Sequence, residues 1–392
     1  MPSISIIGKG LVGSFAVLHF LQETDWIIHW YYDENKQTES VGEATTLEIP
    51  NFLRSVLNFT NEELLKANGT PKTGIKKYNW GKVNRSYIHP FWGGNHGFHF
   101  TAKEIQKQIY KTIEKNQRVL IYNKNIENPE SLKTNFVMVA SGRPDLYDEK
   151  VVHIEENIPV NTAYVVNCYW DNARFLDSLH VARPHGWVFG IPLQNRVSIG
   201  YLYNRNITTK EEIEKDIQNV FDQFNLTPSD EVQNIPFTSF RRKENFTSRV
   251  AYTGNASFFL EPLESTSTTA SIWGIRLSSG VFQKQISVEE AQLEYKKGIR
   301  ESQNMILLHY MAGSVFKTNF WKYAQPMAKQ KIENEIKQRT PWAKFLHSSL
   351  KDYTQMEDHV GAGTWGPFNY NLNCERLGIK TELLELFKKY KY

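Results

Sequence analysis

The chain has 392 residues, a formal net charge of +4 and 40% hydrophobic residues, an ordinary balance for a globular protein with room for two or three domains. Its 46 Lys and Arg residues form no dense basic block, which disfavours nucleic-acid binding. Two cysteines, Cys168 and Cys374, make neither a disulfide framework nor a metal cluster. A strand predicted from Ser3 and the lack of an 18-residue apolar run lead us to expect no signal peptide, no membrane span and a cytoplasmic protein.

The first residues have the pattern of a βαβ unit. Ser3–Ile7 is a short apolar strand, residues 8–13 carry three glycines, Ser14–Glu23 has helical periodicity, and Trp26–Tyr32 is a second strand. The strand ends at Asp33, where a carboxylate can accept a hydrogen bond from a ribose hydroxyl.

Within this unit, Gly8-Lys9-Gly10-Leu11-Val12-Gly13 is a GxGxxG motif between a strand and a helix. Glycines let the backbone turn tightly and approach a pyrophosphate, and a helix N-terminus offers free N–H groups to that anion. A glycine turn can also serve packing alone. Here strand, turn, helix, second strand and acid follow in order, which favours dinucleotide binding without separating FAD from NAD.

Farther along the chain, helical and extended patterns alternate. Helices are expected over Thr101–Glu114, Lys210–Phe224, Val288–Met311, Lys344–Tyr353 and Glu382–Lys389. Strands are expected over Val119–Tyr122, Phe136–Ala140, Trp187–Ile191 and Val197–Tyr203, the last two in a β-rich stretch that begins at Thr162. This order predicts a mixed α/β (α+β) fold: a Rossmann-like module with an inserted β-sheet, plus a smaller, mainly helical module.

Six segments, in order and at compatible spacing, resemble the flavin-dependent tryptophan halogenase family, a branch of the flavin monooxygenase-like fold. They are the glycine turn; Val41-Gly42-Glu43-Ala44-Thr45; Pro71-Lys72-Thr73-Gly74-Ile75-Lys76 before Tyr78-Asn79-Trp80; Gly186-Trp187-Val188-Phe189-Gly190-Ile191-Pro192; Gly254-Asn255-Ala256 leading into Glu261-Pro262-Leu263-Glu264-Ser265-Thr266; and His309-Tyr310 with Thr318-Asn319-Phe320-Trp321. The Pro-Leu-Glu-Ser-Thr and Gly-Glu-Ala-Thr blocks are the more specific ones. The short C-terminal part is similar to compact halogenases carried by marine phages.

The resemblance implies an FAD-binding halogenase core over residues 1–325, with a substrate-facing insertion at about 50–100, and a helical part over residues 326–392. It also implies that a separate flavin reductase supplies reduced FAD, and that chloride, bromide or iodide is consumed. The cofactor-binding residues it implies are Gly8, Gly10, Gly13, Asp33, Glu43, Ala44, Thr45, Trp187, Ile191, Pro192, Gly254 and Asn255.

In such a family, reduced FAD, O2 and halide give hypohalous acid, which halogenates an electron-rich aromatic ring such as an indole or a phenol. Lys72 matches the catalytic lysine, which would hold the oxidant as an ammonium or form a haloamine; the alternative is a solvated lysine, and Lys76 and Lys77 are rivals. Glu264 matches the glutamate that accepts the ring proton, although it could instead cap a loop. Ser265 would relay between the flavin and substrate sites.

The backbone amides of Thr266 and Ser267 would bind halide. Departures from the family pattern are Phe189 for a second Trp, Asn255 for Asp, and Ser267 for Gly, where Ser would add strain if φ is positive. Halide preference therefore stays open.

Substrate contacts are expected from His96, Phe98, Trp365 and Phe368, with His99 and Phe100 as further candidates; the alternative is that these residues belong to the core. Two other functions remain open: an FAD monooxygenase or other oxidoreductase on the same fold, and a flavin-fold protein without catalysis. The partners expected are a small aromatic substrate and the reductase, with a homo-oligomer left open.

Overall fold

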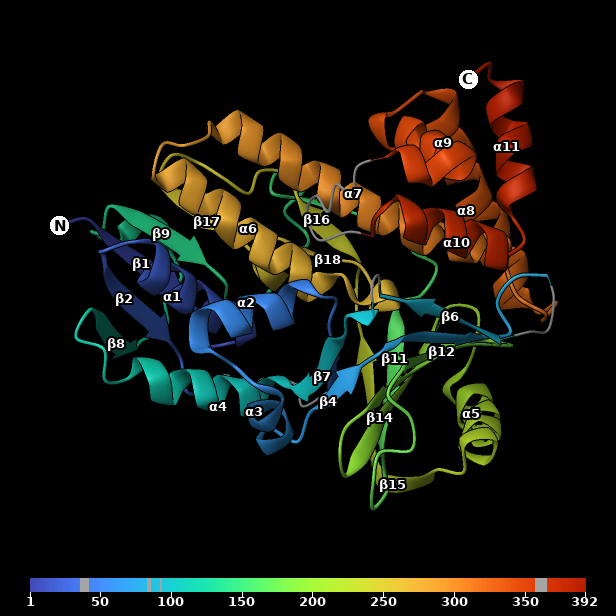
Figure 1. Cartoon of the computed structure of the whole chain (residues 1–392), viewed down its shortest axis with the longest axis horizontal. Coiled ribbons are helices and arrows are strands. Elements are labelled where there is room, and N and C mark those ends of the chain that lie inside the picture. Colours follow the sequence, from blue (N-terminus) through green and yellow to red (C-terminus); the bar gives the residue numbers. More distant parts are fainter. Residues whose placement is uncertain (36–41, 83–85, 92–93, 357–364) are drawn as a thin grey trace.

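The computed structural model describes residues 1–35, 42–82, 86–91, 94–356 and 365–392. Val41, the first residue of the Gly-Glu-Ala-Thr segment, lies outside these ranges. Within them the strands form a five-stranded sheet, a seven-stranded sheet and two three-stranded sheets. Figure 1 shows the five-stranded sheet near the N-terminus and the seven-stranded sheet farther along the long axis, with a group of helices beside it near the C-terminus.

The five-stranded sheet contains the βαβ unit that the first residues predicted. All its strands are parallel, in the spatial order β17 (Val250–Tyr252), β9 (Phe136–Val139), β1 (Ser3–Ile7), β2 (Ile27–Tyr32) and β8 (Val119–Asn123). Parallel strands need crossover connections, and α1 (Leu11–Glu23) and α4 (Ala102–Ile113) supply two of them. Helix α1 begins three residues earlier than predicted because Gly10 is already its N-cap.

The seven-stranded sheet is the β-rich insertion. Its strands are, in spatial order, β15 (Thr227–Pro236), β11 (Thr162–Tyr169), β14 (Arg196–Tyr203), β13 (Gly186–Pro192), β12 (Ser178–Arg183), β5 (Gly74–Tyr78) and β6 (Ser86–Pro90). Helix α5 (Lys210–Phe224), at the predicted bounds, covers one face with an apolar stripe that joins the core of the sheet. Strands β5 and β6 come from the expected substrate-facing insertion, and β5 pairs in parallel with β12.

Two small sheets join the modules. One contains β3 (Gly42–Ala44), β7 (Gly97–Thr101) and β4 (Thr70–Lys72); the other contains β10 (Val152–Ile154), β16 (Phe240–Arg242) and β18 (Phe258–Phe259). Two short helices, α2 (Glu48–Leu57) and α3 (Asn61–Lys66), lie between β3 and β4 in the chain. Strand β7 pairs with both β3 and β4, so it joins the Gly-Glu-Ala-Thr segment to the strand that carries Lys72.

The remaining helices run along the top of Figure 1 and gather near the C-terminus. They are α6 (Ser267–Phe282), α7 (Val288–Ala312), α8 (Asn319–Lys337), α9 (Pro341–Asp352), α10 (Pro367–Arg376) and α11 (Lys380–Lys389). The expected boundary at 325/326 falls inside α8. A single apolar cluster includes side chains from Ile4 to Phe387 and so crosses that boundary.

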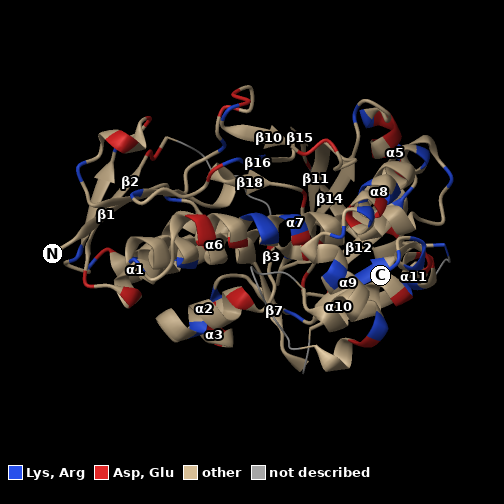
Figure 2. Cartoon of the chain, turned by 90° about the horizontal axis from the view of Figure 1, so that it is seen from above, with Lys and Arg blue, Asp and Glu red and all other residues tan. Residues whose placement is uncertain are grey.

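Charges of both signs are interspersed over the helices near the C-terminus (Figure 2). Lys329 pairs with Glu382 at 2.6 Å and Lys389 with Glu333 at 2.7 Å. Lys329 of α8 therefore lies on a solvated, ion-paired face of that helix. None of the helices in the described part of the chain combines the length and apolar content that crossing a bilayer requires.

Candidate active site

Two buried lysines and a buried glutamate meet where the sheet of β3, β7 and β4, the seven-stranded sheet and the start of α6 converge. Lys72 is the last residue of β4, Lys77 lies within β5, and Glu264 lies in a short 3₁₀ turn, η4 (Leu263–Ser265), directly before α6. All three side chains are 0% exposed. Lysine and glutamate are almost never fully buried unless they are paired, so this cluster is a built feature of the fold.

The turn before α6 has a left-handed backbone at two consecutive non-glycine residues. Glu264 has φ 72° and Ser265 has φ 55°. Such conformations cost on the order of 1–3 kcal/mol each and persist where the surroundings over-determine them, often at functional sites. Thr266 and Ser267 are instead in or next to the helix, with Thr266 at φ −88° and Ser267 the first residue of α6. The positive-φ strain anticipated at Ser267 is thus absent there, and the strain lies at Glu264 and Ser265.

Lys72 contacts the serine of this turn. Its Nζ donates a hydrogen bond to Ser265 Oγ at 2.9 Å and lies 5.6 Å from the centre of the Phe91 ring. Burial disfavours the charged ammonium and lowers the pKa of Lys72 to about 7, although nearby Glu264 opposes this. An amine with that pKa is partly neutral near pH 7, which suits both roles expected for it.

Glu264 uses both carboxylate oxygens. Lys77 Nζ donates to Oε1, and His89 Nδ1 donates to Oε2 at 2.8 Å. His309 Nε2 lies 3.1 Å from Oε1. Burial alone would favour the neutral acid, but the charge of Lys77 and the donor groups around the carboxylate outweigh it and hold the pKa of Glu264 well below its ordinary value. Glu264 is therefore a carboxylate with a fixed orientation.

Aromatic side chains form a wall beside these groups. The Trp365 ring stacks on Phe91 at 5.5 Å and lies 4.1 Å from the ring of His89. Trp365 is 7% exposed, and its Nε1 has no hydrogen-bond partner among the described residues. This places the predicted substrate residue Trp365 next to both the lysine and the glutamate sides of the cluster.

A second buried acid lies three residues before Glu264. Glu261 Oε2 accepts hydrogen bonds from Trp187 Nε1 at 3.0 Å and Tyr310 Oη at 3.1 Å. Burial raises the pKa of Glu261 to about 8, and these two hydrogen bonds oppose the rise. Trp187, from the predicted Trp-x-Phe-x-Ile-Pro segment, is thus anchored to the turn segment that carries Glu264.

The glycine turn fits a dinucleotide pyrophosphate. A Cβ at Gly13 would lie 2.0 Å from the Gly8 carbonyl oxygen, and a Cβ at Gly8, which has φ 119°, would lie 2.6 Å from the Ala140 oxygen. Those two glycines are needed for close backbone packing. A Cβ at Gly10 would meet no atom within 4 Å among the described residues, and no side chain described here caps α1. The second glycine therefore borders open space at a helix N-terminus, as an approaching anion requires.

The other predicted cofactor segments converge on this turn or on one another. A Cβ at Gly254 would lie 3.0 Å from a Val12 methyl, so the Gly-Asn-Ala turn packs on the start of α1. Gly42 N donates to Ser198 Oγ at 3.3 Å, and a Cβ at Gly42 would lie 3.0 Å from Ile191. The remaining residues are placed as follows: Asp33 follows β2, Glu43 and Ala44 lie in β3, Thr45 accepts from Phe98 N, Pro192 accepts from Thr70, and Asn255 is exposed.

The other substrate candidates divide into three groups. His96 Nε2 lies 3.2 Å from Arg54, whose guanidinium is 5.6 Å from the Phe98 ring. His99 bonds Thr70 and Ser178, and both His99 and Phe100 are fully buried, which is the core alternative foreseen for them. Phe368 packs against Tyr353 at 5.7 Å.

Sequence reasoning missed His89, Phe91 and two asparagines of α10. Asn369 Nδ2 donates to His89 Nε2 at 2.9 Å, and Asn373 Nδ2 lies 3.2 Å from the same atom. The alternating burial of Ser86–Pro90 puts Tyr87 and His89 on one face, and that period-2 pattern was the available signal. The asparagines follow 280 and 284 residues later, and nothing local in sequence links them to His89.

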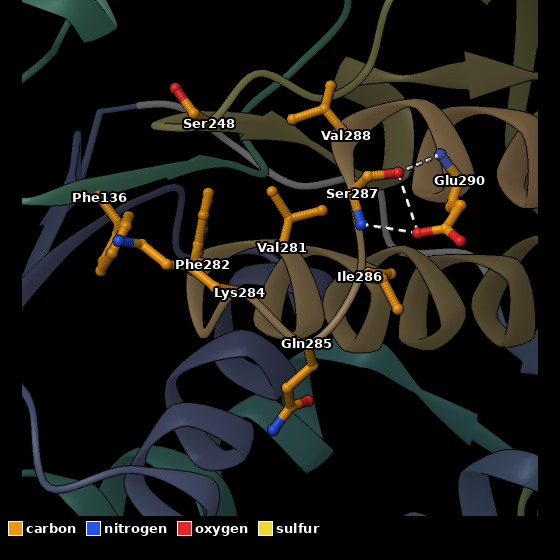
Figure 3. A pocket seen from close by; sticks show the side chains of 10 residues that line it. All are labelled: Phe136, Ser248, Val281, Phe282, Lys284, Gln285, Ile286, Ser287, Val288 and Glu290. Carbon is orange, nitrogen blue, oxygen red and sulfur yellow. Dashed lines mark hydrogen bonds between the residues drawn. The ribbon is translucent and has the colours of Figure 1, made fainter.

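Two surface pockets lie away from this cluster. The one in Figure 3, about 440 Å³, is lined by Phe136, residues 281–282 at the end of α6, and the residues around the capping box in which Ser287 and Glu290 bond each other at the start of α7. The other, about 610 Å³, includes Arg276 and Ser279. Helix α6 has 16 residues, so its far end lies on the order of 20 Å from Glu264. Neither pocket is part of the site.

A five-stranded parallel sheet with a glycine turn, an inserted, mostly antiparallel sheet and a buried lysine–carboxylate cluster between them define the class: an α/β protein with an FAD-type fold and buried charged groups in its interior. The family model for tryptophan halogenase matches residues 3–143 and 102–355. The chain belongs to the tryptophan halogenase family.

Curated relatives match shorter stretches. The chain is 25% identical over 155 residues to the tryptophan 6-halogenase SttH of Streptomyces toxytricini, covering 36% of this chain and 27% of that protein. It is 28% identical over 118 residues to the 7-chloro-L-tryptophan 6-halogenase KtzR of Kutzneria sp. (strain 744), covering 29% of this chain and 22% of that protein. The matched parts thus span about a quarter of the length of these relatives.

Solved structures match the whole fold. Xcc4156, a flavin-dependent halogenase from Xanthomonas campestris, superposes with a TM-score of 0.78 at 18% identity, covering 99% of this chain and 94% of that one. BrvH, a flavin-dependent halogenase from Brevundimonas sp. BAL3, gives 0.72 at 19% identity, with 99% and 97% covered. These likenesses confirm the predicted fold, including the inserted sheet and the helical part.

Proposed function

We propose that the chain is a flavin-dependent halogenase that attaches halide to an electron-rich aromatic substrate such as an indole or a phenol. The observation that carries the proposal is the pairing of two differently tuned buried groups at one turn. Lys72, with a pKa of about 7, bonds Ser265, and the neighbouring Glu264 is a fixed carboxylate. An FAD monooxygenase has no need of a buried amine beside a buried carboxylate.

The glycine turn, with Asp33 and the Gly254–Asn255 segment, would bind FAD, which a separate reductase would supply in reduced form. Bound reduced FAD, with O2 and halide, would supply hypohalous acid. Thr266 is the N-cap and Ser267 the first residue of α6, and N–H groups at a helix N-terminus, which have no partner within the helix, suit a halide ion. Residues 1–325 would form the FAD-binding and halogenating core, and residues 326–392 would close the substrate side.

The chain's own residues would then direct the oxidant. As a neutral amine, Lys72 would take the halogen from hypohalous acid to form a haloamine and release water; as an ammonium, it would hold hypohalous acid by a hydrogen bond. The Ser265 hydroxyl at 2.9 Å orients Lys72 Nζ in either case. The wall formed by Phe91 and Trp365 offers a flat apolar surface for an aromatic ring, and the Trp365 N–H, which has no partner among the described residues, offers a donor. When the ring carbon bonds the halogen, Glu264 accepts the ring proton. In the ammonium route the halogen–oxygen bond breaks and Lys72 gives the proton with which that oxygen leaves as water; in the haloamine route the nitrogen–halogen bond breaks and Lys72 takes up a proton to become the amine again.

The test is Lys72→Met, with Lys76→Met as the matched control, because Lys76 is a partly exposed lysine four residues away. We expect Lys72→Met to lose halogenation by ~10²–10⁴-fold, a typical loss for a positioned reactive group. Hydrogen peroxide release from reduced FAD and O2 should continue in both variants. Products are detected by mass spectrometry with indoles, phenols and anilines in chloride, bromide and iodide.

Enzyme-controlled halogenation at the wild-type rate in Lys72→Met would show that the lysine assignment is wrong. A wild-type protein that gives hydroxylated product regardless of halide would identify an FAD monooxygenase instead. Absence of any product together with weak FAD binding would point to a fold without catalysis.

A further inference from the structure

A second lysine, Lys77, is buried in the site and has no part in the chemistry proposed above. Its side chain is 0% exposed, and its Nζ donates to Glu264 Oε1 and, at 2.6 Å, to His309 Nε2. Burying an ammonium costs several kcal/mol unless the partner geometry is good. Glu264 is the carboxylate that Lys77 contacts in the described part of the chain. The attraction between the two opposite charges therefore offsets the cost of removing each of them from water.

The tautomer of His309 makes this lysine necessary. His309 Nδ1 donates to the Met305 carbonyl oxygen at 2.8 Å, four residues earlier in α7, so its Nε2 carries a lone pair in the neutral ring. That lone pair lies 3.1 Å from Glu264 Oε1. Two facing lone pairs repel unless a donor lies between them. Lys77 Nζ donates to both atoms and removes the repulsion.

The other oxygen of Glu264 is held by a neutral donor. His89 Nδ1 donates to Oε2, while Asn369 of α10 donates to the opposite ring nitrogen. Burial lowers the pKa of His89 to about 4, despite the pull of Glu264 in the other direction, so the ring is neutral at pH 7. His89 therefore orients Glu264 without balancing its charge.

Lys72 cannot balance that charge either. Its Nζ bonds Ser265, and burial leaves it partly neutral near pH 7. A lysine that must react as an amine is a poor permanent counter-ion. Among the described residues, Lys77 is thus the cation in direct contact with Glu264 that no reaction step consumes.

We propose that Lys77 is a positioning residue that keeps Glu264 ionised and fixed beside His309, so that Lys72 is free to take up the oxidant. This inference rests on the halogenase function proposed above. It divides the work between two lysines only five residues apart: one reacts, and the other holds the base. The titratable and charged groups around Glu264 are Lys72 of β4, Lys77 of β5, His89 of β6, His180 of β12, His309 of α7 and Tyr370 of α10.

Removing the charge of Lys77 should let a proton settle between Glu264 and His309. An opposite charge at contact lowers a carboxyl pKa by about 1–3 units. The acidic limb of the kcat–pH profile should therefore move to higher pH by about that much in Lys77→Met and in Lys77→Gln. Gln keeps a hydrogen-bond donor but no charge, so a shift in both variants assigns the effect to charge. Lys77→Arg should restore the wild-type limb.

The second readout does not depend on halogenation. Infrared difference spectra at pH 7 should show a protonated carboxyl band in Lys77→Met that disappears in Lys77→Met/Glu264→Gln. Glu261, whose pKa is about 8, contributes a similar band to every variant, so the subtraction with Glu264→Gln is what assigns the signal. Circular dichroism checks that each variant is folded.

If Lys77→Met and Lys77→Gln fold, have the acidic limb of the kcat–pH profile at the wild-type position and keep Glu264 ionised, the proposed role of Lys77 is wrong. If neither neutral variant folds, acid titration of the wild type decides: a Glu264 band that appears only below the ordinary glutamate range of about pH 4 supports the role, and one at or above that range overturns it. A wild type without halogenated product, but with the band in Lys77→Met, would refute the proposed function and leave the ion pair standing.

Discussion

At the scale of single residues, the site combines groups that sequence could and could not identify. The motif resemblance selected Lys72, Glu264 and Ser265, and the structure brings all three together. It left Lys76 and Lys77 as rivals of Lys72, because strand alternation shows which of the two faces the interior only once the register of β5 is known. Lys77 points inward and Lys76 is partly exposed.

Lys72 also makes a prediction about stability. Its pKa is about 7 in the folded protein and 10.5 ordinarily, so between these values the unfolded chain binds more protons than the folded one. Stability should therefore rise with pH across this window, because the cost of burying an ammonium, present below pH 7, is progressively relieved. From pH 7 to about pH 9.5 the wild type should gain about 3 kcal/mol relative to Lys72→Met.

Urea unfolding of both proteins at the two pH values measures this difference. All other titratable groups are present in both proteins, so their contributions to the pH dependence largely cancel. Equal pH dependence in wild type and variant would mean that Lys72 keeps its ordinary pKa and remains charged inside the fold.

At the scale of elements, local patterns predicted those helices and strands whose periodicity is set by an amphipathic face. Helix α5 is at its predicted bounds, with Ile213 and Ile217 on its buried stripe and a Thr209–Glu212 capping box. Helix α6 was not predicted, because its sequence is rich in Ser, Thr and Gly and nearly all of it is buried. Residues of low helix propensity become helical there through tertiary packing, which no local window reveals.

The turn before α1 gives the prediction for this scale. Gly10 has φ −60°, which any residue can adopt, and a side chain there would point into open space. Gly10→Glu should therefore leave the fold intact while it abolishes FAD binding, because the carboxylate would occupy and repel the pyrophosphate position. Gln22→Glu, on the exposed C-terminal part of the same helix, is the control that adds the same charge elsewhere.

Fluorescence titration with FAD and the thermal midpoint separate the two effects. Wild-type FAD affinity in Gly10→Glu would remove this turn from the cofactor site. Loss of folding would instead show that the space beside Gly10 is closed in solution.

At the scale of the whole molecule, the order of modules followed from sequence, but their integration did not. The βαβ start, the β-rich middle and the helical end were read correctly from periodicity. The site, however, joins β4, β5, β6, the turn before α6, α7 and α10, and Asn369 reaches His89 across 280 residues. Such long-range convergence is encoded in complementary packing rather than in any segment, so Asn369 and Asn373 carried no signal.

That integration predicts how the protein unfolds. Helix α8 runs without a break across residues 325 and 326, and side chains on both sides of this point belong to one apolar cluster. Tyr370, in the C-terminal part, bonds the Glu301 carbonyl oxygen of α7 at 3.0 Å.

Because the two parts share a core, heat should unfold them in one cooperative transition, and a chain ending at residue 325 should expose that core and aggregate. Calorimetry that resolves two transitions, or a 1–325 fragment with a native-like thermal midpoint, would contradict this and establish residues 326–392 as an independent unit. The distinction matters for mechanism. In a shared core, thermal unfolding of α10 also removes the contact of Asn369 with His89, and His89 is one of the two donors that orient Glu264.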